Sequence, residues 1–352
     1  MSGNTGIRPS RLMLIPGVTA PLAESINQGQ LPVKNSVRVE ELINYFSYDY
    51  PAPTDVDAPF NVTTELAPSP YNQDTQLLRI GIKGFDIDTD QLGASNLVML
   101  LDVSGSMSSN DKLPLLKQAL LMLSQQLSAQ DKVSIVVYAG ASGVVLDGVA
   151  GNDFAAISRA LNQLNAQGGT NGSQGIQLAY QLAQKHYIEN GINQVILATD
   201  GDFNLGMTNH QQLVDYVATH SKTGIGWSTL GFGLGNYNDH LLEQLSNKAN
   251  GQYAYIDTLN EARKVLVDQL SATLLTIAHD VKVQIEFNPT VVSEYRLIGY
   301  ENRLLNRSDF NNDAVDAGEI GADATVSLRY TNYVITTAKI TWLIRCVTLH
   351  QR

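Results

Sequence analysis

From residue 96 to about residue 277, the sequence alternates short apolar runs with longer amphipathic stretches. The run Leu97–Leu101 is wholly apolar, as expected for a strand that is buried on both faces of a parallel sheet. The stretch 112–127 repeats leucine and alanine at three- and four-residue spacing, which predicts one buried helix face. This alternation is typical of a doubly wound α/β fold, in which helices cover both faces of a mostly parallel sheet.

Further elements of both kinds follow in the same alternating order. We expect strands at 133–138, 143–146, 194–199, 225–231 and 252–256, and helices at 154–164, 172–187, 213–220, 241–249 and 261–277. The predicted α/β domain spans residues 95–270. In a sheet of this kind, ligands bind outside the carboxyl ends of the strands.

The two flanks have a different pattern. Residues 1–94 contain an expected helix at 39–46 and an expected strand at 77–83, with a proline-rich stretch at 51–75 between them, and we interpret them as a small N-terminal accessory region. After residue 280, apolar and polar residues alternate, which predicts half-exposed antiparallel strands. These strands are expected at 281–287, 294–298 and 325–328. Residues 271–352 therefore form a predicted β-rich C-terminal region.

Composition and charge exclude several classes of function. The chain has 352 residues and a net charge of −11 without a basic run, so we expect no nucleic-acid partner, because phosphate binding needs clustered Lys and Arg. No apolar run is long enough for a transmembrane helix, and the first residues lack the features of a signal peptide. The six histidines lack the paired spacing of a zinc site, and the single cysteine, Cys346, cannot form an internal disulfide.

Oxygen-bearing side chains lie in three segments that are expected at one edge of the sheet. A carboxylate and two hydroxyls follow the first strand, a threonine lies in a Gly-Gly-Thr loop, and a second carboxylate follows the strand at 194–199. The five candidate metal ligands are Asp102, Ser104, Ser106, Thr170 and Asp200. Because this set contains only hard oxygen ligands, it suits Mg²⁺, Mn²⁺ or Ca²⁺ rather than zinc.

This order of ligands resembles the metal-ion-dependent adhesion site of the von Willebrand factor type A domain family, over about residues 95–270. The resemblance implies that both serine hydroxyls ligate the metal directly, and that Thr170 does so directly or through water. Both aspartates would act largely through water. In that family, an acidic side chain of a partner protein fills the open coordination position. The resemblance therefore implies a Mg²⁺-dependent protein-binding or adhesion module, not an enzyme.

Two other interpretations of the same residues stay open. Aspartyl-phosphate enzymes also begin with an Asp at the end of the first strand near a metal, which allows a Mg²⁺-dependent phosphoryl-transfer enzyme, although Ser104 stands where such enzymes usually carry a second Asp. Alternatively, the domain is structural and the site vestigial, with the hydroxyls acting as helix caps or turn formers.

The flanks resemble a narrower group of bacterial type A domain proteins. Segments 27–32, 39–46 and 77–81 are similar to the N-terminal region of that group, and segments 309–313 and 318–322 are similar to its β-rich C-terminal domain. These proteins are typically envelope lipoproteins. The resemblance implies a location in the bacterial cell envelope, periplasmic or membrane-anchored.

Two segments depart from the pattern of that group. Residues 11–26 and 329–352 do not fit it, whereas codons permitted for both segments, read in a shifted frame, encode sequences that do. We therefore expect both segments to be out-of-frame translation and the C-terminal domain to be truncated. Resequencing the gene tests this hypothesis, and an intact frame with unrelated codons would contradict it.

Overall fold

The chain divides into two units in the computed structural model. Residues 1–15, 38–87 and 276–352 form one, the β unit, and residues 16–37 and 88–275 form the other, the α/β unit. The structure describes residues 10–11, 22, 25–26, 28–34, 37–46, 48–55, 58–86, 93–169, 172–201, 210–233, 242, 245–246, 251–269, 276–300, 305, 307–310, 312, 318–334 and 342–349.

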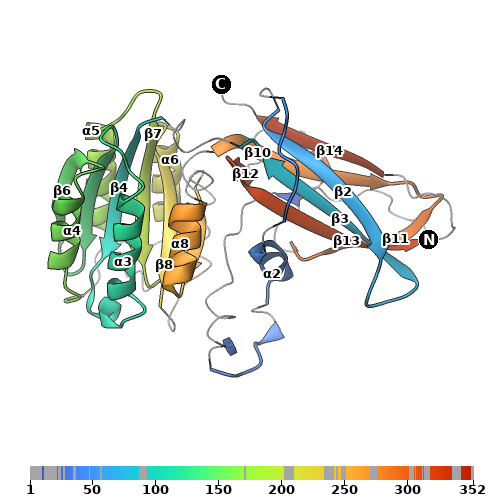
Figure 1. Ribbon diagram of the computed structural model, residues 1–352, viewed down its shortest axis with the longest axis horizontal. Helices are drawn as coiled ribbons and strands as arrows, with labels where there is room; N and C mark the ends of the chain where they lie inside the picture. The colour runs from blue at the N-terminus through green and yellow to red at the C-terminus, as the bar shows by residue number, and fades with distance from the viewer. Residues whose placement is uncertain are drawn as a thin grey trace. The chain divides into compact units, whose positions relative to one another are not determined.

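The α/β unit is built on a six-stranded sheet with the order β6-β5-β4-β7-β8-β9 (Figure 1). The strands are β4 (Ser95–Asp102), β5 (Lys132–Tyr138), β6 (Ser142–Ala150), β7 (Ile192–Thr199), β8 (Gly226–Phe232) and β9 (Tyr253–Ile256). All neighbouring strands are parallel except β5 and β6. The structure thus confirms the expected mostly parallel sheet.

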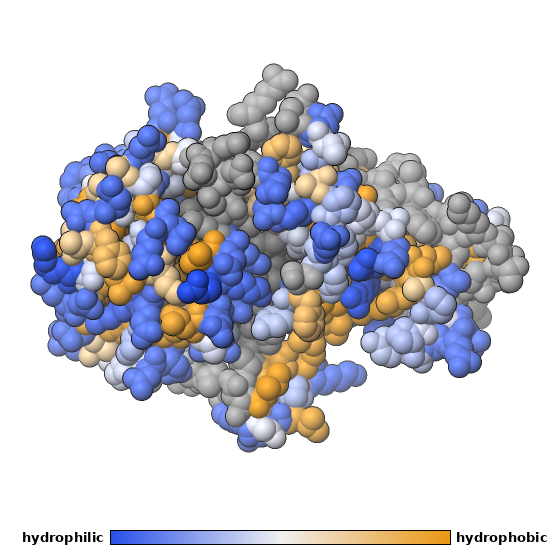
Figure 2. Space-filling model, viewed as in Figure 1, coloured by the Kyte–Doolittle hydropathy of each residue, from blue (hydrophilic) through white to orange (hydrophobic). Residues whose placement is uncertain are grey.

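Helices cover both faces of this sheet. The first face packs on α3 (Leu113–Ser124), α4 (Phe154–Gln163) and α8 (Leu259–Arg263), and the second on α5 (Ser173–Lys185) and α6 (His210–Ser221). Because successive strand side chains point to opposite faces, Met99 belongs to the first core and Leu100 to the second. All of β4 is therefore buried, which explains its apolar run. Hydrophilic residues cover most of the face of this unit seen in Figure 2.

The β unit combines strands from both ends of the chain. One sheet has the order β11-β13-β3-β2, and in the other β10 pairs with β1, β12 and β14. The strands are β1 (Ser10–Arg11), β2 (Phe60–Pro68), β3 (Thr75–Gly84), β10 (Thr276–Phe287), β11 (Val292–Ile298), β12 (Gly318–Gly321), β13 (Thr325–Val334) and β14 (Trp342–Leu349). The antiparallel pairing of β3 with β13 joins the N-terminal and C-terminal regions, which the sequence analysis treats separately, in one unit.

The expected N-terminal helix is α2 (Val39–Tyr45), and hydrogen bonds attach it to β13. The Ser327 backbone N–H donates to Asn44 Oδ1 at 2.7 Å, and Asn44 Nδ2 donates to the Tyr300 hydroxyl at 2.9 Å. Short helices among the described residues also include η3 (Gly105–Ser108), the π-helical turn η4 (Lys264–Asp268) and η6 (Arg307–Asp309). No helix among the described residues is long and apolar enough to cross a membrane.

Two expected elements differ from the structure. The closing helix predicted to reach residue 277 ends earlier, because Thr276 and Ala278 pair with β12 and begin β10. The proline-rich stretch 51–75 contains β2, which the sequence analysis did not predict. Pro68 is tolerated because β2 is an edge strand and Pro68 ends it. Most of the expected helix 241–249 lies outside the described residues.

The segments expected to be out of frame are described only in part. Residues 329–334 end β13 and pair with β11 and β3, and residues 342–349 form β14 against β10. Of residues 11–26, the structure describes four, at positions 11, 22, 25 and 26. The frame hypothesis stays a prediction about the gene.

Candidate metal centre

The two candidate carboxylates lie at adjacent strand ends. Asp102 ends β4 and Asp200 follows β7, and the parallel register of these strands pairs Leu101 with Ala198. The loop before Thr170 lies at the same edge, because the Gly105 N–H donates to the Gly168 carbonyl at 3.1 Å. Thr170 itself lies outside the described residues. The structure therefore brings together four of the five candidates.

The two serine hydroxyls are hydrogen-bonded to each other. Ser104 Oγ and Ser106 Oγ are 3.0 Å apart, and either can be the donor. Ser104 is buried and precedes η3, whereas Ser106 is exposed within η3. The pair therefore reaches from the interior to the surface at the end of β4.

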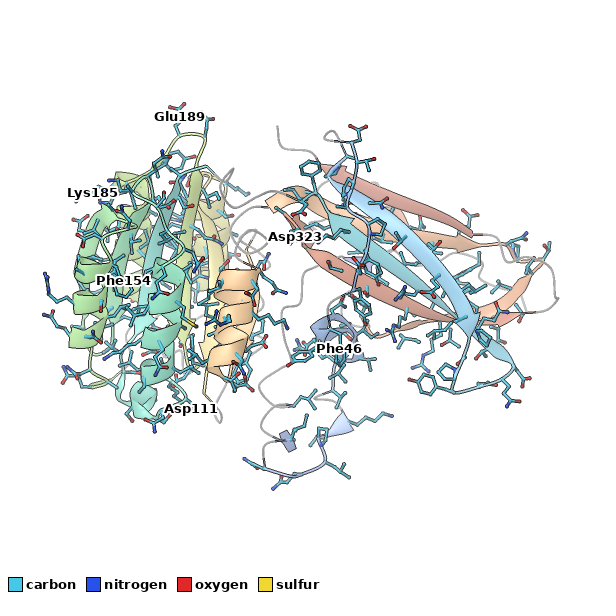
Figure 3. All side chains as sticks on the ribbon, viewed as in Figure 1. Phe46, Asp111, Phe154, Lys185, Glu189 and Asp323 are labelled. Carbon is cyan, nitrogen blue, oxygen red and sulfur yellow. The ribbon has the colours of Figure 1, made fainter. Side chains whose placement is uncertain are left out.

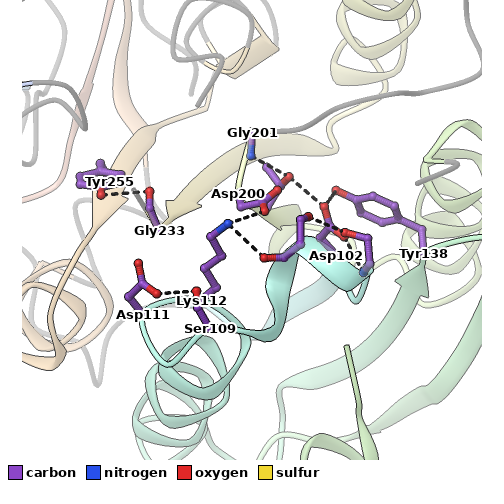
Figure 4. Close-up of polar contacts among 12 residues, drawn as sticks. Asp102, Ser109, Asp111, Lys112, Tyr138, Asp200, Gly201, Gly233 and Tyr255 are labelled. Atoms are coloured by element: carbon purple, nitrogen blue, oxygen red, sulfur yellow. Dashed lines mark hydrogen bonds and ion pairs between the residues drawn. The ribbon is translucent and has the colours of Figure 1, made fainter. Parts of the chain in front are cut away.

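Donors from three residues hold the buried carboxylate of Asp102. The Ser104 backbone N–H donates to Oδ1 at 2.9 Å, while the Tyr138 hydroxyl and Thr199 Oγ1 donate to Oδ2 at 3.2 and 3.1 Å (Figure 4). Burial raises the pKa of Asp102 to about 6, and the hydrogen bonds from Ser104 act in the opposite direction. A nearby cation would favour the ionised form, since opposite charges lower the pKa of a carboxyl group.

Asp200 is paired with a lysine that the sequence analysis did not single out. Lys112 Nζ lies 2.8 Å from Asp200 Oδ2 and donates to the Ser106 carbonyl at 3.0 Å (Figure 4). Lys112 is the residue before α3, directly after the loop that carries both serines. The sequence places Lys112 six residues after Ser106, which was the one indication that it could reach the site. Spacing alone, however, does not tell where a long side chain points.

The donor set fits a small, hard divalent cation. Two oxygen ligands of Mg²⁺ at right angles, each about 2.1 Å from the metal, are about 3 Å apart, which matches the separation of the two serine hydroxyls. The second carboxylate comes from the neighbouring strand end, and the expected set contains no nitrogen or sulfur ligand. In the part of the chain that the structure describes, no cluster of three His, Cys, Asp or Glu residues suggests a different metal site.

The sheet order and the helices on both faces are those of a von Willebrand factor type A domain, and the chain contains one. Residues 97–202 match the von Willebrand factor type A domain family, and residues 20–79 match a second family described as von Willebrand factor. Residues 272–343 match the family described as "Uncharacterized protein YfbK, C-terminal".

Two curated relatives and one solved structure illustrate the similarity. "Uncharacterized protein YfbK" of Escherichia coli is 45% identical over 320 residues, covering 89% of this chain and 56% of the relative. "Uncharacterized protein sll0103" of Synechocystis is 32% identical over 205 residues, covering 57% of this chain and 48% of the relative. The structure of a von Willebrand factor type A protein from Catenulispora acidiphila superposes with a TM-score of 0.52 at 15% identity, covering 87% of this chain and 72% of that one.

These similarities establish the fold and the domain family. The chain spans about half the length of the curated relatives that it matches. Domains of this family commonly mediate protein-protein interaction and are generally not enzymes.

Proposed function

We propose that the α/β unit binds a partner protein through a divalent cation. Asp102, Ser104, Ser106, Thr170 and Asp200 would hold Mg²⁺, with Mn²⁺ and Ca²⁺ as other candidates. An acidic side chain of the partner would complete the coordination sphere. The observation that carries this proposal is the 3.0 Å separation of the two serine hydroxyls beside two carboxylates from adjacent strand ends.

Charge supports a binding role for such a cation. Both serines are neutral ligands, and Asp102 is already held by donors from Ser104, Tyr138 and Thr199. A divalent cation in these surroundings keeps part of its positive charge, since few anionic groups contact it. It therefore stays attractive to an incoming carboxylate.

Calorimetric titration of the full chain with Mg²⁺ and Mn²⁺ tests the metal site. The wild type is expected to bind one ion, and Ser104→Ala to bind it at least about ten-fold more weakly, since it lacks a direct ligand. Ser128→Ala is a matched control, because Ser128 is exposed and its hydroxyl accepts a turn hydrogen bond from the Gln130 N–H, away from the candidate ligands. If the wild type bound neither Mg²⁺ nor Mn²⁺, the proposal would be refuted and the interpretation as a structural domain would be favoured.

A pull-down from envelope extract tests for a partner protein by comparing the proteins that the chain captures in Mg²⁺ with those that it captures in EDTA. Proteins retained by the wild type in Mg²⁺ are expected to be lost in EDTA and with Ser104→Ala. The same protein preparations are assayed for phosphatase activity. Activity that Asp102→Asn abolishes would favour the phosphoryl-transfer interpretation instead.

The cell envelope is the proposed location. It rests on the likeness of segments such as 39–46 and 318–322 to bacterial envelope proteins. Fractionation of cells that express the native gene tests it, and recovery only with cytosolic markers would contradict it.

A further inference from the structure

Lys112 lies within the candidate metal centre, and its contacts give it a role that depends on the proposed metal site. Its ammonium group contacts the carboxylate of Asp200 and the carbonyl of Ser106. The side chain of Lys112 is 16% exposed and that of Asp200 only 2%. This ion pair is therefore largely shielded from water. Charges in such surroundings interact more strongly than charges at an open surface.

The aliphatic part of Lys112 is held in place by the end of β8. Gly233 follows β8 with φ of +78°, and a Cβ atom there would lie 2.3 Å from Lys112 Cε. The Gly233 carbonyl in turn accepts a hydrogen bond from the Tyr255 hydroxyl at 3.1 Å (Figure 4). The ammonium group is thus positioned by packing as well as by its hydrogen bonds.

We infer that Lys112 sets the metal affinity of the centre: its fixed positive charge weakens binding of the free cation and makes stable binding depend on an incoming carboxylate. With both aspartates ionised, Asp102, Asp200 and Lys112 leave one net negative charge. A divalent cation turns this into one positive charge, and a single partner carboxylate neutralises it.

A purely structural role for Lys112 predicts the opposite change in affinity. If the lysine only held Asp200 in position, removing it would misplace the carboxylate and weaken metal binding. If its charge opposes the cation, removing the charge strengthens binding. The sign of the change in metal affinity therefore separates the two roles.

The test is calorimetric titration of the full chain with Mn²⁺ alone, comparing the wild type with Lys112→Gln. Glutamine keeps hydrogen-bonding capacity without the charge. Mn²⁺ is expected to bind this variant about ten-fold more tightly than the wild type, because one charge in direct contact commonly changes the ionisation constant of a neighbouring group by about that factor. Lys112→Arg keeps the charge and is expected to retain the wild-type affinity. Lys112→Met, which keeps the packing against Gly233 without the charge, is titrated as the second neutral variant.

Lys185→Gln is the matched control. Lys185 on α5 also contacts an aspartate, since its Nζ lies 2.6 Å from Asp147 Oδ2. Figure 3 shows Lys185 high on the α/β unit and Asp111, the neighbour of Lys112, at its lower edge. This variant is expected to keep the wild-type affinity for Mn²⁺.

The possible outcomes separate this inference from the proposed function. If the wild type binds no Mn²⁺, the metal site itself is refuted. If the wild type binds Mn²⁺ and the neutral variants bind it equally or more weakly, the role of Lys112 is refuted and the metal site stands. Tighter binding by both neutral variants and unchanged binding by Lys112→Arg would support the inference.

Discussion

The α/β unit and the β unit bury their sheets in different ways. The strands of the α/β unit come from one continuous stretch of chain, and helices cover both faces. The main sheet of the β unit pairs β3, near the start of the chain, with β13, near its end. The first arrangement can be anticipated from local apolar patterns, whereas the second depends on pairing between distant segments.

The two units also differ in where their buried ionisable groups lie. The α/β unit buries Asp102 at a strand end, where burial disfavours its charged form and raises its pKa. The β unit buries Glu40 and Glu41 on α2 and Lys282 on β10. Hydrogen bonds of Asn44 to Ser327 and Tyr300 join α2 to β13. Both units therefore bury ionisable groups, and the candidate metal centre lies in the α/β unit.

The largest expected effect is in the α/β unit, from Gly251→Ala. A Cβ atom at Gly251 would lie 1.3 Å from the backbone carbonyl oxygen of Trp227, which cannot move without disturbing β8. We expect a loss of about 4 kcal/mol in the free energy of unfolding, at the upper end for overpacking. Urea unfolding followed by the fluorescence of buried Trp227 measures it.

Gly143→Ala is the matched control for this substitution. Nothing lies within 4 Å of a Cβ atom at Gly143 in β6, so the change in unfolding free energy is expected to stay within about 0.5 kcal/mol. Equal effects of the two variants would show that close backbone approach does not limit the α/β unit.

The pH dependence of metal-free stability tests the buried charge of Asp102. Because its pKa rises from 3.8 to about 6 in the folded state, the folded protein binds the proton more tightly than the unfolded chain does. Stability in EDTA should therefore fall as pH rises from about 4 to 6, by at most about 3 kcal/mol. Urea unfolding across this pH range measures the effect.

Asp102→Asn isolates the contribution of this carboxyl group. The variant cannot ionise there, so the difference in pH dependence between it and the wild type reports Asp102 alone. If the free energies of unfolding of the two proteins changed in parallel with pH, burial of Asp102 would not destabilise its ionised form.

Gly81→Ala should act on the β unit instead. A Cβ atom at Gly81 would lie 2.3 Å from the ring of Tyr50, whose hydroxyl is hydrogen-bonded to Ser327 Oγ at 2.8 Å. We expect a loss of about 2 kcal/mol, because the ring must shift and strain that bond. Hydrogen exchange should increase in β3 and β13 and stay unchanged in β4 and β7. Faster exchange in both units would show that they unfold together.

Asn44→Ala is expected to have the smallest effect of these changes. It removes the acceptor for the Ser327 N–H and the donor to the Tyr300 hydroxyl, which should cost about 1 to 2 kcal/mol. Hydrogen exchange of α2 and β13 measures the change. Asn162→Ala is the control, because the Asn162 side chain is exposed and bonds only Ser158 on the same helix. An equal effect of both substitutions would mean that Asn44 does not secure α2.

Much of the α/β fold was predictable from the sequence. The predicted strand 97–101 is β4, and its apolar residues alternate between the two cores. Strand β2 was not predicted because its residues lie among prolines. The last helix was predicted to reach residue 277 because helical spacing along the sequence does not reveal the pairing of Thr276 with β12. Local patterns fail where a distant strand provides the partner.

The candidate site was predictable to a similar extent. Asp102 and Asp200 follow apolar runs, so their position at strand ends followed from the pattern, and the parallel register brings these ends together. The contributions of Tyr138 and Lys112 were not predicted, because each reaches the site through a side chain from another part of the fold.

The sequence by itself determined the order of strands and helices in the α/β unit and the positions of the candidate oxygen ligands at the ends of its strands, because both depend on residues close together in the chain. Only the tertiary structure decided that the two flanks share one β-sheet and that Lys112 contacts Asp200. Those outcomes depend on which strand edges remain unpaired and on where a long side chain packs, and no local pattern of residues specifies either one.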